Sequence, residues 1–379
     1  MTSHPDNILN VAERVMKYAP LVSYDYPEMD TGINVAKKEL IDNIKNKVYK
    51  FIERYSQEPD YLISIRWFYT QKLIDFTHTD PLIPYNDDDN EGLYNELIKL
   101  NALPKDIAEL KTIITNMINN FDRTLNYADP LNINNYQNNF VYQKKNCKFT
   151  LSQSSHDKLY KLCKLYSDKV TDDVIETRIF NLLCRYESLA APGYHASIPN
   201  KIFTLLHQEL KVNHELFASP FNCNLELNSY TSAYPDTDKF FGSKGNFFNV
   251  YPKLFEKGGS FEANPPFLEE HMAALSLIII RTLEMSVPLS FVVFYPLWDD
   301  SFGYQELYNS KYNILSDKVL HFERNEHYYI QSSQYWLKGY NRKSNSRSCI
   351  FILQNNMGKI KYPVTPEIID KLSNNFKYE

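Results

Sequence analysis

The sequence predicts a mostly parallel α/β domain that follows a helical domain, and two patterns indicate this. In the first half, apolar residues such as Ile33, Leu40 and Phe51 recur at a spacing that places them on one face of a helix. From about residue 195 onward, short runs of Val, Ile, Phe and Tyr bounded by turns alternate with helical stretches. Strands that alternate with helices favour a parallel sheet. We expect the helical domain over residues 1–195 and the α/β domain over residues 196–379.

Each further element is predicted from its own stretch of the chain. The helical spacing returns in residues 61–76, 107–121 and 172–189. Between these stretches lie a turn-rich acidic loop, Pro81–Gly92, and an Asn-rich connector, Ala128–Asn139. The second half predicts buried strands at residues 216–218, 260–263, 290–295 and 348–353, with helices at 202–210 and 268–284.

Composition limits the classes of function. The chain of 379 residues carries 41 Lys and Arg against 46 Asp and Glu, a net charge of −5. A mildly acidic protein of this kind does not coat a long nucleic acid by neutralising its phosphates. Only 10 residues are glycine, which argues against several Gly-rich phosphate loops, whereas 29 Tyr, 23 Phe and 3 Trp allow stacking or a sizeable core.

The cysteines and the apolar runs predict a location. The five cysteines include no Cys-x-x-Cys pair, and their odd number suits a reducing compartment rather than a disulfide framework or a zinc site. The first 20 residues lack the apolar core of a secretory signal, and the run Ala273–Ile280 is too short to span a membrane. We therefore expect an intracellular protein with no membrane segment and no metal.

One motif carries specific chemistry. Ser260–Ala263 reads as a strand that ends in Asn264-Pro265-Pro266-Phe267 and is followed directly by a helix. In α/β sheets, ligands bind beyond the carboxyl ends of the strands, so this loop lies where a site is expected. The alternative is an ordinary strand-to-helix turn with Phe267 in the core.

The motif suits chemistry on the exocyclic amine of adenine, whose lone pair is delocalised into the ring. The Asn264 amide oxygen can accept one amine hydrogen and the Pro265 carbonyl the other, which directs the lone pair out of the ring plane. Pro266 favours an extended Pro265, and Phe267 can stack on the base. Catalysis then consists of positioning and fixed dipoles, with a sulfonium, S-adenosylmethionine, as the implied methyl donor. The base must be unstacked to enter such a site.

Five segments carry a family resemblance. They are ELFASPFNCN (Glu215–Asn224), SAYPDTDKFFGSKG (Ser232–Gly245), GSFEANPPFLEEHM (Gly259–Met272), PLSFVVFYPLW (Pro288–Trp298) and CIFILQNN (Cys349–Asn356). In order and spacing they resemble the phosphorylated-CTD-interacting-factor family, methyltransferases that act on N6 of the cap-adjacent adenosine of mRNA. The resemblance implies a Rossmann-like, S-adenosylmethionine-dependent methyltransferase domain preceded by an α-helical domain.

The same resemblance assigns roles to residues of the donor site. Asn264, Pro265, Pro266 and Phe267 would be catalytic and would hold the target adenine. The candidates for binding the donor are Ser219, Pro220, Asn222, Asn264, Pro265, Phe267 and Glu269. Glu269 is equally well explained as a first-turn acid that complements the helix dipole.

Other residues are candidates for the rim of the site. Phe267, Tyr295, Pro296 and Trp298 would frame the substrate, although a core position is the alternative for Trp298. Gly242 and Ser243 could also place backbone close to the ligand, although a simple turn explains them equally well. Asp236 and Asp238 could accept hydrogen bonds from a ribose hydroxyl, although a solvated turn explains them better.

The expected partner is the 5′ end of a capped mRNA, since an RNA end needs aromatic stacking and a few cations rather than a long basic groove. Candidate phosphate contacts are Arg342, Lys343 and Arg347, or helix-borne Lys37, Lys38 and Arg66. Which of them binds, and whether a 2′-O-methyl group is required, is left open by the sequence, as are the oligomeric state and the host organism.

The chain departs from the family in two features. No Trp precedes Trp67, so we expect no WW module ahead of the helical part and no binding to a phosphorylated polymerase tail. No basic nuclear-localisation run is present; the family resemblance implies the nucleus, and a viral member would be cytoplasmic. The alternative functions are N6-adenine methylation of non-cap RNA or DNA, and a non-catalytic cap-binding module.

Overall fold

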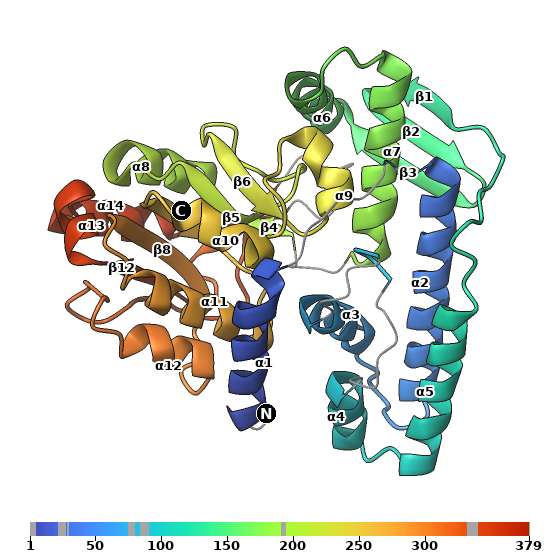
Figure 1. The fold of residues 1–379 in the computed structure, drawn as a ribbon, viewed down its shortest axis with the longest axis horizontal. Coiled ribbons are helices and arrows are strands. Elements are labelled where there is room, and N and C mark those ends of the chain that lie inside the picture. Colours follow the sequence, from blue (N-terminus) through green and yellow to red (C-terminus); the bar gives the residue numbers. More distant parts are fainter. Residues whose placement is uncertain are drawn as a thin grey trace. The chain divides into compact units, whose positions relative to one another are not determined.

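The computed structural model describes residues 5–21, 28, 30–74, 80–83, 91–190, 195–331 and 340–378. It divides into two compact units, coloured along the chain in Figure 1. The first, which we call the sheet unit, comprises Met1–Leu21 and Pro192–Glu379. The second unit is Val22–Ala191.

A six-stranded sheet forms the centre of the sheet unit, with the strand order β6-β5-β7-β8-β12-β9. The first four strands are parallel to one another, β12 runs antiparallel to β8, and β9 runs antiparallel to β12. Their bounds are β5 His214–Ala218, β6 Ser229–Ser232, β7 Gly259–Ala263, β8 Leu289–Pro296, β9 Leu320–Phe322 and β12 Ser348–Gln354. The predicted mixed fold with a mostly parallel sheet is therefore confirmed.

Helices cover both faces of this sheet. They are α1 Pro5–Tyr18, α8 Asn200–Leu210, α9 Pro235–Asp238, α10 Phe247–Phe255, α11 Glu269–Thr282, α12 Phe302–Tyr308, α13 Asn356–Lys361 and α14 Pro366–Phe376, with 3₁₀ turns η1 Ala19–Leu21 and η2 Lys239–Phe241. Every residue of β8 and β12 is buried, as expected for strands covered on both faces.

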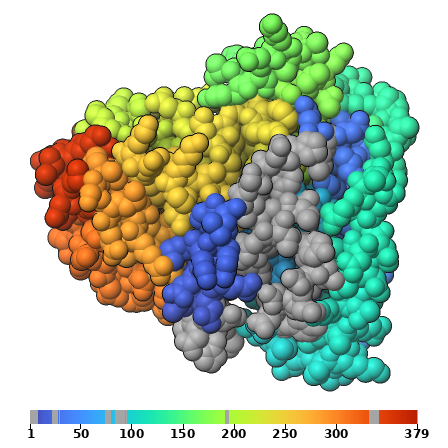
Figure 2. Space-filling view, in the orientation of Figure 1, coloured from blue at the N-terminus to red at the C-terminus, as the bar shows by residue number. Residues whose placement is uncertain are grey.

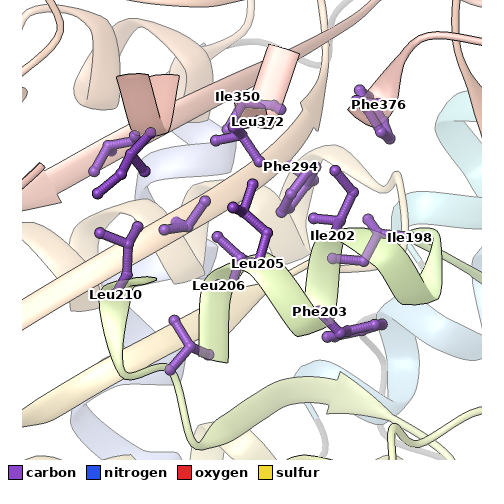
Figure 3. Close-up of a cluster of buried hydrophobic side chains, with 14 of the residues drawn as sticks. Ile198, Ile202, Phe203, Leu205, Leu206, Leu210, Phe294, Ile350, Leu372 and Phe376 are labelled. Carbon is purple, nitrogen blue, oxygen red and sulfur yellow. The ribbon is translucent and has the colours of Figure 1, made fainter. Parts of the chain in front are cut away.

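Alternation along β8 divides its side chains between the two helical layers. Phe291 stacks edge-on against Phe255 of α10, with ring centroids 5.2 Å apart. Val292 and Phe294 point the other way, into a cluster with the apolar face of α8 and residues of α14 (Figure 3). In Figure 3 the α8 side chains Ile202 and Leu206 face the sheet. The helical spacing of the apolar residues in this segment places them on one face of α8, and that face forms part of the core.

Helix α1 belongs to the sheet unit although it comes from the start of the chain. It packs against α11 and α12, and in Figure 2 it is the dark blue helix beside the orange segment. Tyr251 and Asn249 of α10 donate hydrogen bonds to the carbonyls of Met16, at 3.2 Å, and Ala19, at 2.7 Å.

A small antiparallel sheet completes the sheet unit, in the order β11-β10-β4. Its strands are β4 Ala196–Ser197, β10 Tyr328–Gln331 and β11 Tyr340–Lys343. Ala196 pairs with Gln331, and Tyr329 pairs with Arg342. This pairing links the segment that precedes α8 to the last third of the chain.

The second unit is mainly helical but also contains a sheet. Its helices are α2 Thr31–Ile52, α3 Leu62–Ile74, α4 Glu91–Lys99, α5 Pro104–Asn119, α6 Gln153–Tyr166 and α7 Asp172–Ser188. The strands β1 Asn132–Tyr136, β2 Asn139–Lys144 and β3 Cys147–Ser152 form an antiparallel sheet.

These observations correct the predicted helical domain over residues 1–195 on two points. The expected Asn-rich connector contributes β1, because Gln137 and Asn138 adopt positive φ angles and turn the chain back as a hairpin. Helix α1 lies in the sheet unit, because its apolar face packs on α11. Most of the acidic loop Pro81–Gly92 lies outside the described residues.

Candidate active site

The candidate site lies at the edge where the parallel strands end. Since β5, β7 and β8 run parallel, the segments after them reach the same edge of the sheet. These segments are the turn Ser219–Cys223, the loop Asn264–Phe267 and the residues Leu297–Trp298. The topology therefore brings three separately predicted segments to one edge.

The Asn264 side chain has a fixed orientation. Its amide nitrogen donates a hydrogen bond of 3.1 Å to the carbonyl oxygen of Ala196 in β4. Because an amide has its donor and its acceptor on opposite corners, this bond directs the Oδ1 oxygen away from Ala196. The loop then enters α11 through a bond of 2.7 Å from the Leu268 N–H to the Pro266 carbonyl.

The Ser219–Cys223 turn is held by its own side chains. Asn222 Oδ1 accepts from the Ser219 N–H at 2.7 Å and from its hydroxyl at 2.8 Å, while Asn222 Nδ2 donates to the His195 carbonyl at 3.3 Å. Ser219 and Pro220 are buried. The predicted donor-site residues Ser219 and Asn222 therefore shape the turn, and their side chains bond within it and to His195.

The β4 segment is consequently tied to both loops. Asn222 binds the carbonyl of His195, and Asn264 binds that of the next residue, Ala196. Two amides that follow different strands thus bind consecutive carbonyls of one segment. Sequence reasoning did not find this role of β4, because the partners are 27 and 68 residues apart in the chain.

Aromatic rings from three segments surround Phe267. Its ring is edge-on to Trp298, with centroids 6.5 Å apart, and to Tyr329 of β10, with centroids 6.2 Å apart. Phe267 is half-buried and packs against the core under α8, whereas Trp298 is 39% exposed. Trp298 therefore does not fill the core. Tyr329 is a member of the site that the sequence did not reveal.

The other predicted rim and donor residues are placed differently. Tyr295 is fully buried and donates to the Met272 carbonyl at 2.7 Å, so the expectation that it shapes the rim is wrong. The expectation fails because the Tyr295 side chain lies on the face of β8 that α11 covers. Pro296 is buried at the end of β8, where its carbonyl accepts from the Trp298 N–H at 2.9 Å. Glu269 is half-buried in the first turn of α11.

The segment after β6 is a buried turn rather than a solvated one. Asp236 is 4% exposed and Asp238 fully buried. The Asp238 carboxylate accepts from the Tyr234 N–H at 3.2 Å and from the Thr237 hydroxyl at 2.9 Å. Gly242 has φ 95°, as a turn requires, so Asp238 and Gly242 have structural explanations.

Two glutamates form an unexpected buried pair beneath this edge. Glu262 of β7 is fully buried, and Glu215 of β5 is 2% exposed. The two residues are opposite one another in the parallel register. Burial, and then the neighbouring Glu215, raise the pKa of Glu262 well above its usual value. The sequence signal for this pair is Glu262 itself, a charged residue between Phe261 and Ala263 in an apolar strand.

The candidate phosphate contacts separate into two groups. Lys37 is buried against Asp80, Lys38 pairs with Asp42, and Arg66 pairs with Asp60 and Glu96, so these three cations already have carboxylate partners in the second unit. In the sheet unit, the candidates are exposed: Arg342 and Lys343 on β11, and Arg347. The Arg347 carbonyl accepts from the Leu297 N–H at 3.1 Å, which places Arg347 beside the Trp298 segment.

Two kinds of feature are absent from the described residues. No helix in the described ranges is long and apolar enough to cross a membrane. Within those same ranges, no group of three His, Cys, Asp or Glu side chains is arranged to hold a metal ion.

The mostly parallel six-stranded sheet, with the Asn-Pro-Pro-Phe loop at its carboxyl edge, fits the fold of a methyltransferase. Residues 157–332 match the family model described as "Phosphorylated CTD interacting factor 1 WW domain". This segment of the chain is therefore similar to the phosphorylated-CTD-interacting-factor family, as the five sequence segments indicated. Because the matched description names a WW domain, it contradicts the expectation that the chain lacks one.

Curated relatives agree with this family. The chain is 37% identical over 205 residues to a human protein named "mRNA (2'-O-methyladenosine-N(6)-)-methyltransferase". It is 35% identical over 239 residues to the mouse protein of the same name. The matches cover 52% and 60% of this chain but 28% and 33% of those relatives, so the chain spans about a third of their length or less.

Proposed function

We propose that this protein transfers a methyl group from S-adenosylmethionine to N6 of the adenosine next to the cap of an mRNA. The observation that carries the proposal is the Asn264–Phe267 loop at the carboxyl edge of the sheet, with the Asn264 amide held by Ala196. The named activity of the relatives, mRNA methylation at N6 of 2′-O-methyladenosine, supports the same substrate class.

In this proposal Asn264 and Pro265 position the amine of the base. Asn264 Oδ1 accepts one amine hydrogen and the Pro265 carbonyl accepts the other, which localises the nitrogen lone pair. Phe267, braced edge-on by Trp298 and Tyr329, sets the plane of the base. These fixed dipoles need no reorganisation during the reaction, so they favour the transition state without a strong base.

The residues present fit a cationic methyl donor. The Glu262 carboxyl is buried and its oxygens have no hydrogen-bond partner among the described residues, as expected where a positive ligand is to be bound nearby. The Ser219–Cys223 turn and Asn264, Pro265, Phe267 and Glu269 would hold the donor, which supplies the electrophilic methyl group.

A panel of labelled-donor reactions tests the activity. Purified protein with methyl-labelled donor is expected to label RNAs that begin m7GpppA or m7GpppAm, and not those that begin m7GpppG or pppA. The ratio of the first two rates reports whether the 2′-O-methyl group matters. Equal labelling of internal adenosines in uncapped RNA or in DNA would contradict the cap assignment, and cap binding without transfer would indicate a non-catalytic module.

Trp298 offers a second test, which concerns substrate binding alone. Trp298→Ala removes an exposed ring from the rim, and stacking on such a ring contributes about 1–3 kcal/mol. We expect KM for capped RNA to rise on the order of tenfold or more, with little change in the Kd of the donor. Tyr136→Ala, which removes a 67% exposed ring from the second unit, is the control. An unchanged KM in Trp298→Ala would remove Trp298 from the substrate site.

An intracellular location belongs to the same proposal: the nucleus by family resemblance, or the cytoplasm for a viral member. Imaging of the tagged protein in its host would decide between the two.

A further inference from the structure

The buried pair Glu215–Glu262 lies on β5 and β7, the two adjacent strands that lead into the loops of the candidate site. Glu262 is two residues before Asn264 in β7, and Glu215 is four residues before Ser219 in β5. The two glutamates are register neighbours on adjacent parallel strands. Both loops that would hold the donor therefore begin within a few residues of this pair.

The two glutamates differ in their hydrogen bonding. Glu215 accepts a bond of 3.0 Å from the Asn224 N–H. Neither oxygen of Glu262 has a hydrogen-bond partner among the residues that the structure describes, although the side chain is fully buried. An isolated ionised carboxylate in such a place is costly, so it must take up a proton or face a positive charge.

Among the residues that the structure describes, those registered opposite Glu262 on its two neighbouring strands carry no positive charge. Glu215 on β5 is an acid, and Val292, opposite Glu262 on β8, is apolar. On β10, burial raises the pKa of the Tyr329 hydroxyl, and Cys349 and Glu262 raise it further, so Tyr329 is neutral. The pair therefore favours carrying one proton between its two carboxyls.

Building on the proposed function, we infer that the Glu215–Glu262 pair is the counter-charge for the cationic methyl donor: it holds one proton in the free protein and releases it when the donor binds. The O–H bond of the protonated carboxyl breaks, the proton passes to the buffer, and no bond to the donor forms. The sulfonium and ammonium charges of the donor favour the ionised carboxyl, because opposite charges interact strongly where water is excluded.

Isothermal titration calorimetry measures this proton directly. Binding of S-adenosylmethionine near neutral pH, in two buffers of different ionisation enthalpy, is expected to release close to one proton from the wild-type protein. S-adenosylhomocysteine, which lacks the sulfonium charge, is expected to release less. Donor affinity should also rise with pH, by up to about tenfold per unit, over the range where the free pair holds its proton.

Glu262→Gln is the main variant, because an amide has the shape of the protonated acid and cannot titrate. We expect it to fold normally, to bind the donor without releasing a proton, and to show a flatter pH dependence of Kd. Glu215→Gln removes the like-charged neighbour and should reduce the release without abolishing it. Glu256→Gln, an exposed site on the same unit, is the matched control and should behave as wild type.

Infrared difference spectroscopy gives a readout that needs no donor. The free wild-type protein should show the carbonyl stretch of a buried protonated carboxylic acid, and Glu262→Gln should lack it. Absence of that band, donor binding without proton release, or equal release by Glu262→Gln would each overturn the inference. Failure of the wild-type protein to bind the donor at all would instead overturn the proposed function, and this inference with it.

Discussion

Replacing Asn264 by alanine is expected to lower kcat for methyl transfer by about 10²- to 10³-fold, the usual effect of removing one preorganised hydrogen-bonding group from a transition state. The side chain is half-buried and makes one bond to Ala196, so the fold should survive. Single-turnover rates with labelled donor and capped RNA, together with circular dichroism and a thermal melt, measure the two effects. A rate near that of wild type would show that the proposed amine contact is wrong.

Asn264→Asp tests whether the side chain at this position must be oriented by β4 or need only provide an acceptor oxygen. Aspartate retains an acceptor oxygen, but its carboxylate cannot donate to the Ala196 carbonyl and would repel it. We therefore expect Asn264→Asp to lose most of the activity as well. Full activity in this variant would mean that the bond to β4 does not position the amide.

Replacing Asp80 by asparagine is expected to destabilise the second unit by about 3–5 kcal/mol, because removing one partner of a buried ion pair leaves the other charge uncompensated. Lys37 Nζ lies 2.7 Å from the Asp80 carboxylate, and the two side chains are 1% and 4% exposed. Arg123 adds a second contact at 3.3 Å. Urea denaturation followed by circular dichroism measures the loss.

A surface pair is the control for this prediction. Asp42 bonds Lys38 and Lys45, but its side chain is 38% exposed, so Asp42→Asn should cost less than about 1 kcal/mol. Similar losses in the two variants would contradict the distinction between the buried and the exposed pair.

The same pair predicts how acid affects stability. Burial alone would raise the pKa of Asp80, but the charges of Lys37 and Arg185 outweigh it and hold the pKa below its usual value. The contribution of Asp80 is therefore complete above the pKa it has in the unfolded chain, and is lost as the pH falls through its lower folded pKa. Asp80→Asn should flatten the acid side of the stability profile.

Long apolar segments were predictable because their pattern is local. The strand predicted at residues 290–295 is β8, Leu289–Pro296, and that at 348–353 is β12, Ser348–Gln354. The edge strand β6, Ser229–Ser232, was missed because four residues rich in Ser and Thr carry no apolar run. The two-residue strand β4 exists only through its pairing with β10.

The candidate site was predictable to a similar degree. Asn264, Phe267 and Trp298 follow from a motif and from strand ends, and the structure brings them to one edge of the sheet. Tyr295 was assigned to the wrong face, because a residue near the end of a strand can point to either layer, and only the packing of α11 decides which. Tyr329 and Ala196 carry no motif and lie far from Asn264 in the chain.

The sequence by itself determined a mildly acidic protein with little glycine, a parallel sheet, and an Asn-Pro-Pro-Phe loop at the end of a strand, since composition and local periodicity specify these features. Tertiary structure alone decided that β4 orients the Asn264 amide, that Lys37 is neutralised by Asp80, and that Glu215 and Glu262 are neighbours. These are contacts between residues more than 40 positions apart, and they depend on strand order and burial, which no local pattern records.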